Sequence, residues 1–263
     1  MRPKPAAELA AVSMPTPLSS DAVVLRSINY SDTSLIVRLF TEQFGKVSVI
    51  AKGARRPKRS VAGVLQPPNH ITVWYQHKEG RDIQTLIKSE FVERYAGLTA
   101  DLARSAAALV TVEMLDRAVH DSDPHPILFR LITSTLRQLD QIAGDVAVLL
   151  HFYQLHLARQ LGFGPRLSAC GQCGRALNKA SLDMTSGSLL CASCRTAEGI
   201  RLGRSSLEHL RDLDGTHISR LAELHADDET TKETGNFLLN HLFFHVDGMS
   251  NLKSIKFWRQ VTA

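Results

Sequence analysis

The sequence from Cys170 to Cys194 reads CGQCGRALNKASLDMTSGSLLCASC and contains all four cysteines of the chain. They form two pairs with two residues inside each pair and seventeen residues between the pairs: Cys170, Cys173, Cys191 and Cys194. Two tight turns of this kind can direct four sulfurs at one ion, which is the spacing of a four-cysteine zinc site. We therefore predict that residues 168–196, called the zinc segment below, hold one zinc ion.

The residues between the two cysteine pairs predict a short hairpin. Residues 181–184 and 189–190 flank a turn that contains Gly187, and Gly174 permits a sharp turn after the first pair. Two disulfides or four inert buried thiols are the alternatives. Disulfides need an oxidising compartment, and nothing in the sequence indicates export. Four thiolates leave no open position on zinc, so we expect a structural ion and no zinc catalysis.

Length and composition are those of an ordinary globular protein. The chain has 263 residues, of which 44% are hydrophobic and 22% charged, enough for one large or two modest domains. No uncharged apolar run reaches the length of a membrane span. Residues 1–19 are rich in Pro, Ala and Ser and lack the apolar core of a signal peptide. We predict a disordered leader at residues 1–19 of a cytoplasmic protein without membrane contact.

The positive charge of the chain is concentrated in one segment. Residues 46–59 contain six of the 31 Lys and Arg residues and none of the 26 Asp and Glu residues. The rest of the chain therefore carries 25 basic and 26 acidic residues, so this segment accounts for the whole positive excess.

Residues 20–95 alternate between apolar and polar positions, a pattern typical of strands. About five short strands with glycine and proline turns predict a small antiparallel barrel such as an OB-fold, and an SH3-like barrel fits nearly as well. The candidate strands are residues 22–27, 35–39, 47–50, 61–66, 71–76 and 83–91.

The periodicity changes to that of helices near residue 99. Thr99 is a candidate cap with Asp101 in the first turn, and Asp145 is a candidate cap for an almost wholly apolar helix. Residues 96–263 therefore predict a helical domain with the zinc segment inserted, and the fold class is α+β. The candidate helices are residues 99–120, 126–144, 145–162, 205–213, 218–225 and 228–246.

The sequence carries no catalytic motif that we could identify. His241 and His245 are four residues apart, but no glutamate follows His241, so they are better interpreted as bundle histidines. Neither a GxSxG elbow nor a GxxxxGK[ST] loop is present. A nuclease would need clustered carboxylates, whereas residues 227–229 point in different directions on a helix. We predict that the protein is not an enzyme.

The basic segment predicts contact with nucleic acid, because it has no acidic partner in sequence and lies between strands of the expected barrel. Four aromatic residues of the same domain are candidates for base stacking: Phe40, Phe44, Trp74 and Tyr75. The alternative is a solvated surface loop. The predicted nucleic-acid-binding residues are Lys46, Lys52, Arg55, Arg56, Lys58 and Arg59.

A zinc-ribbon transcription regulator is a second hypothesis. Such a protein should present a recognition helix rich in Arg and Lys. In residues 205–213, Arg211 is balanced by Glu208 and Asp212, which makes the signal weak.

Several motifs together resemble the RecO family of bacterial DNA repair proteins. They are TEQFGK at residues 41–46, AKGARRPK at 51–58, GVLQP at 63–67, LGFGPRLSACGQCG at 161–174 and LKS at 252–254. The resemblance covers nearly the whole chain and is most specific at residues 41–67 and 162–194.

This resemblance implies an N-terminal OB-fold, a helical domain and a zinc-binding region. It also implies a non-enzymatic recombination mediator at the bacterial nucleoid that binds single- and double-stranded DNA and anneals complementary strands. The implied partners are the acidic tail of single-stranded DNA-binding protein, RecR and, indirectly, RecA. For the tail we expect a site near Arg130, with Phe129 and Leu131 as apolar neighbours and Arg137 as a second cation.

Overall fold

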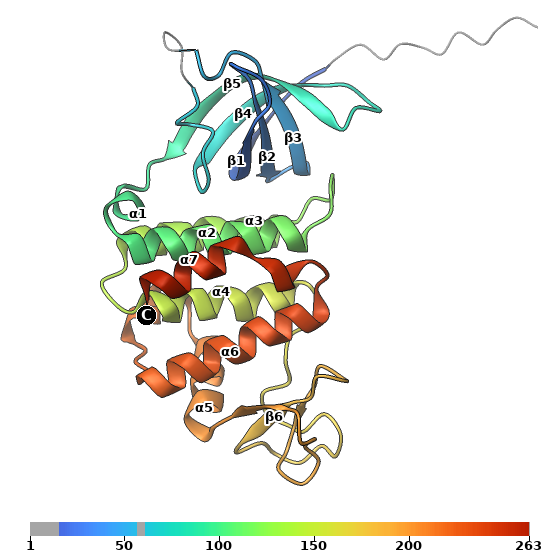
Figure 1. Cartoon of the computed structure of the whole chain (residues 1–263), viewed down its shortest axis with the longest axis vertical. Coiled ribbons are helices and arrows are strands. Elements are labelled where there is room, and N and C mark those ends of the chain that lie inside the picture. The colour runs from blue at the N-terminus through green and yellow to red at the C-terminus, as the bar shows by residue number, and fades with distance from the viewer. Residues whose placement is uncertain (1–15, 57–60, 263) are drawn as a thin grey trace, which may run out of the picture.

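The computed structural model describes residues 16–56 and 61–262. A β-barrel lies at one end of the molecule, a stack of helices in the middle, and the small sheet of the zinc segment at the opposite end (Figure 1). This arrangement confirms the predicted α+β class. The proposed leader lies outside the described residues as far as residue 15. No helix in the described part of the chain has the length and apolar character needed to cross a membrane.

Five strands form the barrel. Its closed order is β1-β2-β3-β5-β4, in which only the β3–β5 pair is parallel, in agreement with the predicted OB-fold. The first half of β1 pairs with β4 and its second half with β2, so this one long strand belongs to both sides of the barrel. The strands are β1 Thr16–Asn29, β2 Leu35–Thr41, β3 Gly45–Ala51, β4 His70–His77 and β5 Ile83–Glu93.

Two expectations for this region are wrong. Residues 16–19, assigned to the leader, belong to β1, where Thr16 pairs with His77 and Ser19 with Trp74. Residues 61–66, expected as a strand, form turns instead. The reason is packing, because Leu65 is fully buried in the core of the barrel, and the turns of its segment allow it to reach that core.

The helices pack around α4, which is buried on nearly all sides as predicted. Asp145 caps α4 by accepting the N–H of Ala147 at 2.8 Å. The first predicted helix is divided: Asp101, rather than Thr99, caps α2 by accepting the N–H of Arg104 at 2.9 Å. The helices are α1 Ala96–Ala100, α2 Leu102–Ala118, α3 Pro126–Gln141, α4 Val146–Gln160, α5 Arg204–Gly215, α6 Asp228–His245 and α7 Lys253–Val261, with 3-10 turns η2 Ile218–Glu223 and η3 Met249–Asn251.

The zinc segment contributes two strands of a three-stranded sheet. β6 Ala180–Leu182 pairs with β7 Leu189–Leu190, which confirms the predicted hairpin with Gly187 in its turn at φ +67°. The third strand, β8 Ile200–Leu202, was not predicted and pairs with the other side of β6. Leu182 and Leu202 are buried in the same core as the helices, which ties this sheet to the bundle.

The outer wall of the barrel packs directly on the helices. Phe40 of β2 is buried against Phe129 of α3, with ring centroids 6.1 Å apart. Gly45, at φ +66°, lies so close to the backbone of Asp123 that any added Cβ would clash there. Apolar burial and a close backbone contact therefore fix the barrel on the bundle, and this junction determines which cations of the barrel remain accessible.

Candidate nucleic-acid interface and metal centre

The four cysteines lie together as predicted. Their sulfurs are all within 4.8 Å of one another, and the Cys173 and Cys191 sulfurs are 3.7 Å apart. A tetrahedral zinc site with bonds of about 2.3 Å has sulfurs about 3.8 Å apart. A disulfide would require about 2.05 Å, so the four residues fit a shared ion and not a bridged pair.

The backbone around the cysteines supports this arrangement. Gly174, at φ +73°, donates its N–H to the Cys170 carbonyl at 2.9 Å, which closes the first turn. The N–H of Cys191 points at the Cys170 sulfur at 3.3 Å and joins the two turns. N–H groups aimed at sulfur stabilise thiolates, the form that binds metal.

The four thiols also influence one another's ionisation. Burial opposes ionisation of Cys170, but the N–H groups of Cys173, Cys191 and Gln172 lower its pKa to about 6. The neighbouring thiols of Cys173 and Cys191 raise the pKa of Cys194 to about 12. Four sulfurs this close cannot all be negative without a positive ion between them. The four cysteines thus lie where one metal ion could bind all four sulfurs.

Lys46, predicted to bind nucleic acid, is instead buried at the junction of barrel and bundle. Its Nζ donates to the carbonyl oxygens of Asp116 at 3.0 Å and Val119 at 2.6 Å. It also lies 3.9 Å from an Asp116 carboxylate oxygen and 3.5 Å from one of Asp121. The prediction for Lys46 is therefore wrong in physical terms, because the folded chain brings it acidic partners that are distant in sequence.

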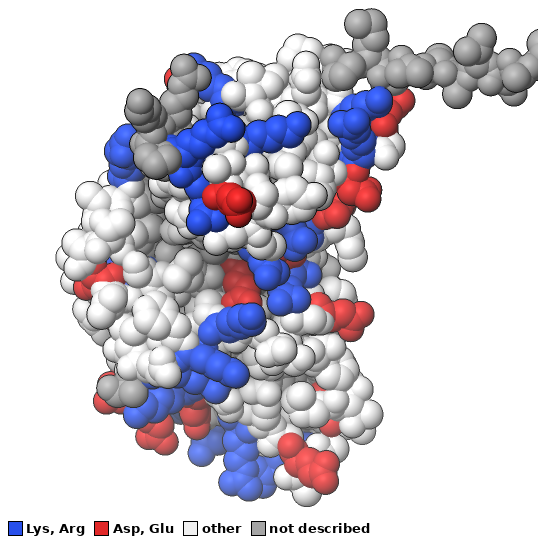
Figure 2. All heavy atoms as spheres, turned by 45° about the horizontal axis from the view of Figure 1, so that its top comes forward, with Lys and Arg blue, Asp and Glu red and all other residues white. Residues whose placement is uncertain are grey.

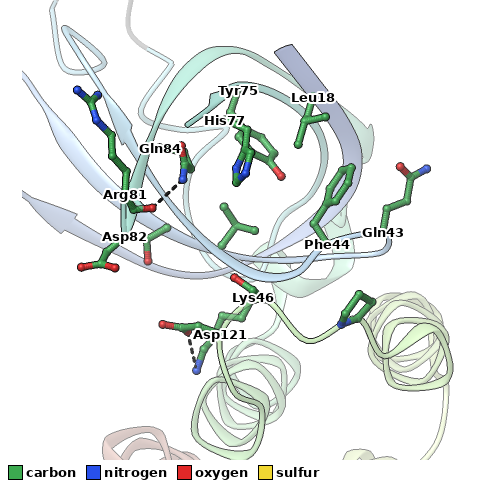
Figure 3. Close-up of a pocket in the computed structure, with 14 residues that line it drawn as sticks. Leu18, Gln43, Phe44, Lys46, Tyr75, His77, Arg81, Asp82, Gln84 and Asp121 are labelled. Carbon is green, nitrogen blue, oxygen red and sulfur yellow. Dashed lines mark hydrogen bonds and ion pairs between the residues drawn. The ribbon is translucent and has the colours of Figure 1, made fainter. Parts of the chain in front are cut away.

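The mouth of the barrel holds a pocket of about 440 Å³ next to this ion pair (Figure 3). Phe44 and Tyr75 form an aromatic wall, with their rings edge to face at 6.2 Å. Lys46 and Asp121 lie at the lower edge of the pocket, where a dashed line joins them. The cations of the lining, Lys46 and Arg81, are matched by Asp82 and Asp121, so this pocket offers no excess positive charge.

The other described cations of the basic segment are exposed on the loop between β3 and β4: Lys52, Arg55 and Arg56. Lys58 and Arg59 lie outside the described residues. The loop is attached to the neighbouring β1–β2 loop, because Arg55 donates its N–H to Thr33 O at 3.0 Å and its guanidinium reaches Ser31 O at 3.5 Å. Figure 2 shows Lys and Arg side chains gathered on this part of the barrel.

The aromatic candidates are mostly unavailable for stacking. Phe40 and Tyr75 are buried, and Phe44 is half-buried. Trp74 is half-buried beneath Lys88, whose Nζ lies 5.0 Å from the ring centroid. Sequence reasoning missed Tyr30, which is 62% exposed in the β1–β2 loop that holds Arg55. Its position at the end of a strand and before a turn was the available signal.

Arg130 is exposed on α3 beside a shallow pocket of about 230 Å³. Ile127, which is 54% exposed, and Leu131 supply apolar surface, and His156 of α4 lines the other side. Phe129 and Arg137, the other residues predicted for this site, do not line the pocket. Phe129 is buried against Phe40, and Arg137 forms an ion pair with Glu93 at 3.0 Å.

The arginines of α5 are not free to act as a recognition helix. Arg211 donates to the carbonyl oxygens of Leu167 and Leu177 at 2.8 and 2.7 Å, which holds the start of the zinc segment. Arg204 pairs with Glu208 at 2.9 Å.

His241 is buried with its Nε2 2.6 Å from the Phe163 carbonyl oxygen, and burial lowers its pKa to about 4. It therefore serves the bundle, as expected.

Comparisons with known proteins agree on one family. Residues 14–95 match the family described as "Recombination protein O N terminal", and residues 99–254 match "Recombination protein O C terminal". The chain is 30% identical over 247 residues to the DNA repair protein RecO of Pelobacter propionicus, covering 94% of this chain and 98% of the relative. It is 28% identical over 246 residues to RecO of Bacillus pumilus, covering 93% and 94%. RecO of Salinibacter ruber is 42% identical over 144 residues, or 55% of each chain.

Proposed function

Because the chain belongs to the RecO family of DNA repair proteins, we propose that it acts in recombinational repair as a mediator without catalytic activity. In this proposal it binds single- and double-stranded DNA, anneals complementary strands, engages single-stranded DNA-binding protein and, with RecR, helps to load RecA at the bacterial nucleoid. The barrel, from residue 16 to about residue 95, forms the nucleic-acid-binding domain, and residues 96–263 carry the partner surfaces and the zinc segment.

The observation that carries the DNA-binding proposal is the exposed cationic loop of the barrel. Lys52, Arg55 and Arg56 have no ion-pair partner within 4.0 Å among the described residues. The exposed ring of Tyr30 lies in the loop that contacts Arg55. OB-folds bind single strands by placing cations along the phosphates and aromatic rings under the bases. The same two elements are present here on adjacent loops.

We propose that the metal is zinc and that its role is structural. Cys170, Cys173, Cys191 and Cys194 would hold the ion with four thiolates. Such an ion supplies folding free energy and leaves no coordination position for water or substrate. The zinc segment packs its leucines into the helical core, so the ion stabilises the bundle rather than a reaction centre.

Replacing Arg55, Arg56, Lys58 and Arg59 with alanine should weaken binding to single-stranded DNA of any sequence about equally. Each lost phosphate contact reduces the slope of log affinity against log salt by about 0.7, so the slope should flatten by roughly two to three units if most of the four make contact. Fluorescence anisotropy over a range of salt concentrations measures both quantities.

Two variants serve as controls for this experiment. Tyr30→Ala should lower affinity without changing the salt slope, because stacking releases no counterions. Alanine at Arg204 and Arg220, exposed cations of the helical part, should change neither. A quadruple loop variant with full affinity and an unaltered slope would show that the basic loop is only a solvated surface.

Charge reversal of Arg130 should weaken binding of an acidic peptide that ends in apolar residues, the chemistry expected for the partner's tail. One exposed charge contact is lost and one repulsion is added, so affinity should fall about 3- to 10-fold in a calorimetric titration. Lys232→Glu, an equal charge change at an exposed site on α6, is the matched control. Unchanged affinity in Arg130→Glu would remove this residue from the tail site.

A further inference from the structure

A second cationic surface lies in the cleft between the barrel and the helices. The cleft has a volume of about 460 Å³. Leu25 and Arg26 of β1 form its wall on the barrel side, and Arg117 of α2 with Lys253 and Phe257 of α7 form the opposite wall. Figure 2 shows Lys and Arg side chains both above and below the hollow between the two parts of the molecule, with acidic side chains between them.

The acidic groups of this cleft are already engaged by the protein. Glu113 accepts the N–H groups of Lys253 at 3.1 Å and Ser254 at 2.8 Å, and the Ser254 hydroxyl at 2.6 Å. Although partial burial opposes it, these hydrogen bonds lower the pKa of Glu113. Asp116 accepts two hydrogen bonds from Arg38, both at 3.1 Å, and lies beside Lys46. Asp116 is therefore taken up by Arg38 and Lys46, and Glu113 by the start of α7 and by the nearby charge of Arg117.

Those cations have no such partners. Arg26, Arg117 and Lys253 are exposed, and in the described ranges none of them lies within 4.0 Å of an acidic group. The α7 helix adds exposed Lys256 and Arg259 and contains no acidic residue. The cleft and α7 therefore present five exposed cations without a direct ion pair among the described residues, of which only Arg117 feels a nearby carboxylate, that of Glu113.

The spacing of these cations suits a chain of negative charges. Positions 253, 256 and 259 are three residues apart, so each is a neighbour of the next on the surface of α7 and the three cover about a third of its circumference. A rise of about 1.5 Å per residue places them at intervals of about 4.5 Å along the helix. Arg26 and Lys253 line the same pocket of about 460 Å³ from opposite walls, so a strand in the cleft would lie between two cations. Phe257 offers apolar surface inside the cleft for the edge of a base.

We propose that a single DNA strand held on the barrel continues through this cleft and along α7, with its phosphates beside Arg26, Arg117, Lys253, Lys256 and Arg259. This inference rests on the DNA-binding function proposed above and adds a second segment to the path. The barrel alone then holds a short strand, and a longer strand gains the contacts of α7.

The test compares two lengths of oligothymidine on the full chain. The triple variant Lys253→Gln, Lys256→Gln and Arg259→Gln should bind an oligomer of about 8 nucleotides, within the reach of one OB-fold, as the wild type does. A 30-mer should bind about tenfold more weakly, because three phosphate contacts along α7 are lost. The salt slope for the long oligomer should flatten by about two units. Glutamine keeps the helix propensity, and the backbone N–H groups bound by Glu113 remain.

A matched control removes three other exposed cations, in Arg204→Gln, Arg220→Gln and Lys232→Gln, and should bind both oligomers normally. Equal losses for both lengths in the α7 variant, or no loss for either, would overturn the proposal. The proposal would also be overturned if the α7 variant no longer bound the acidic tail peptide but still bound the long oligomer normally. The cleft would then be a peptide site. Failure of the wild type to bind either oligomer would instead refute the DNA-binding function itself.

Discussion

Replacing Cys173 with serine should release the proposed zinc ion and unfold the zinc segment, while the barrel keeps its structure. Binding of structural zinc contributes about 10–16 kcal/mol of folding free energy in small zinc peptides, so a site with one thiolate missing loses much of its local stability. The loss should extend into the bundle, because Leu182 and Leu190 pack in the helical core and Arg211 holds Leu167 and Leu177.

Native mass spectrometry and thermal unfolding with and without a chelator measure this effect. We expect one zinc per chain in the wild type and none in Cys173→Ser. The thermal unfolding transition of the variant should no longer shift when the chelator is added. Gln172→Ala is the matched control, since it changes the exposed neighbouring side chain and keeps the backbone N–H that faces Cys170. Two disulfides in freshly purified protein, or full metal content in Cys173→Ser, would contradict the assignment.

The sequence was most informative where local pattern and tertiary structure agree. The cysteine spacing predicts a site whose sulfurs do lie within 4.8 Å of one another, because short turns of fixed geometry build each half. The apolar character of residues 146–160 predicts a central helix, and α4 is buried almost throughout. In both cases the information lies within a few residues of the feature that it predicts.

Prediction failed where distant contacts decide the outcome. Residues 61–66 have a strand-like composition, but Leu65 is buried in the core of the barrel and the chain turns around it. The α7 helix was not predicted, because its N-terminus is capped by Glu113, which lies 140 residues earlier in the chain. Sequence-local rules for caps cannot find such a partner.

Lys46 shows the same limit at the candidate interface. The absence of acidic residues between positions 46 and 59 predicts that every cation there is free. In the fold, the start of β3 contacts the loop after α2, and Ser122 donates its N–H to Lys46 O at 3.0 Å. Asp116 and Asp121 then reach the ammonium group. Charge patterning along a sequence therefore overestimates the number of accessible cations, because it also counts cations that the tertiary structure buries.

Replacing Lys46 with methionine should destabilise the protein by about 3–5 kcal/mol, the usual cost of removing one partner from a buried ion pair. Methionine keeps most of the volume but leaves the carbonyl oxygens of Asp116 and Val119 without their donor. The Asp116 carboxylate retains Arg38, so the barrel should stay attached in native conditions. The melting temperature should fall by roughly 6–20 °C for a chain of this size.

Lys52→Met provides the matched control, because this residue is exposed on the same barrel and should change stability by less than about 0.5 kcal/mol. A double-mutant cycle with Asp116→Ala isolates the coupling of the pair, which for contacting residues is about 0.5–3 kcal/mol. Because the Lys46 ammonium group is turned into the junction and away from solvent, DNA affinity of the folded Lys46→Met protein should equal that of the wild type. A variant with unchanged stability and reduced DNA affinity would restore Lys46 to the nucleic-acid interface and show that the junction opens when DNA binds.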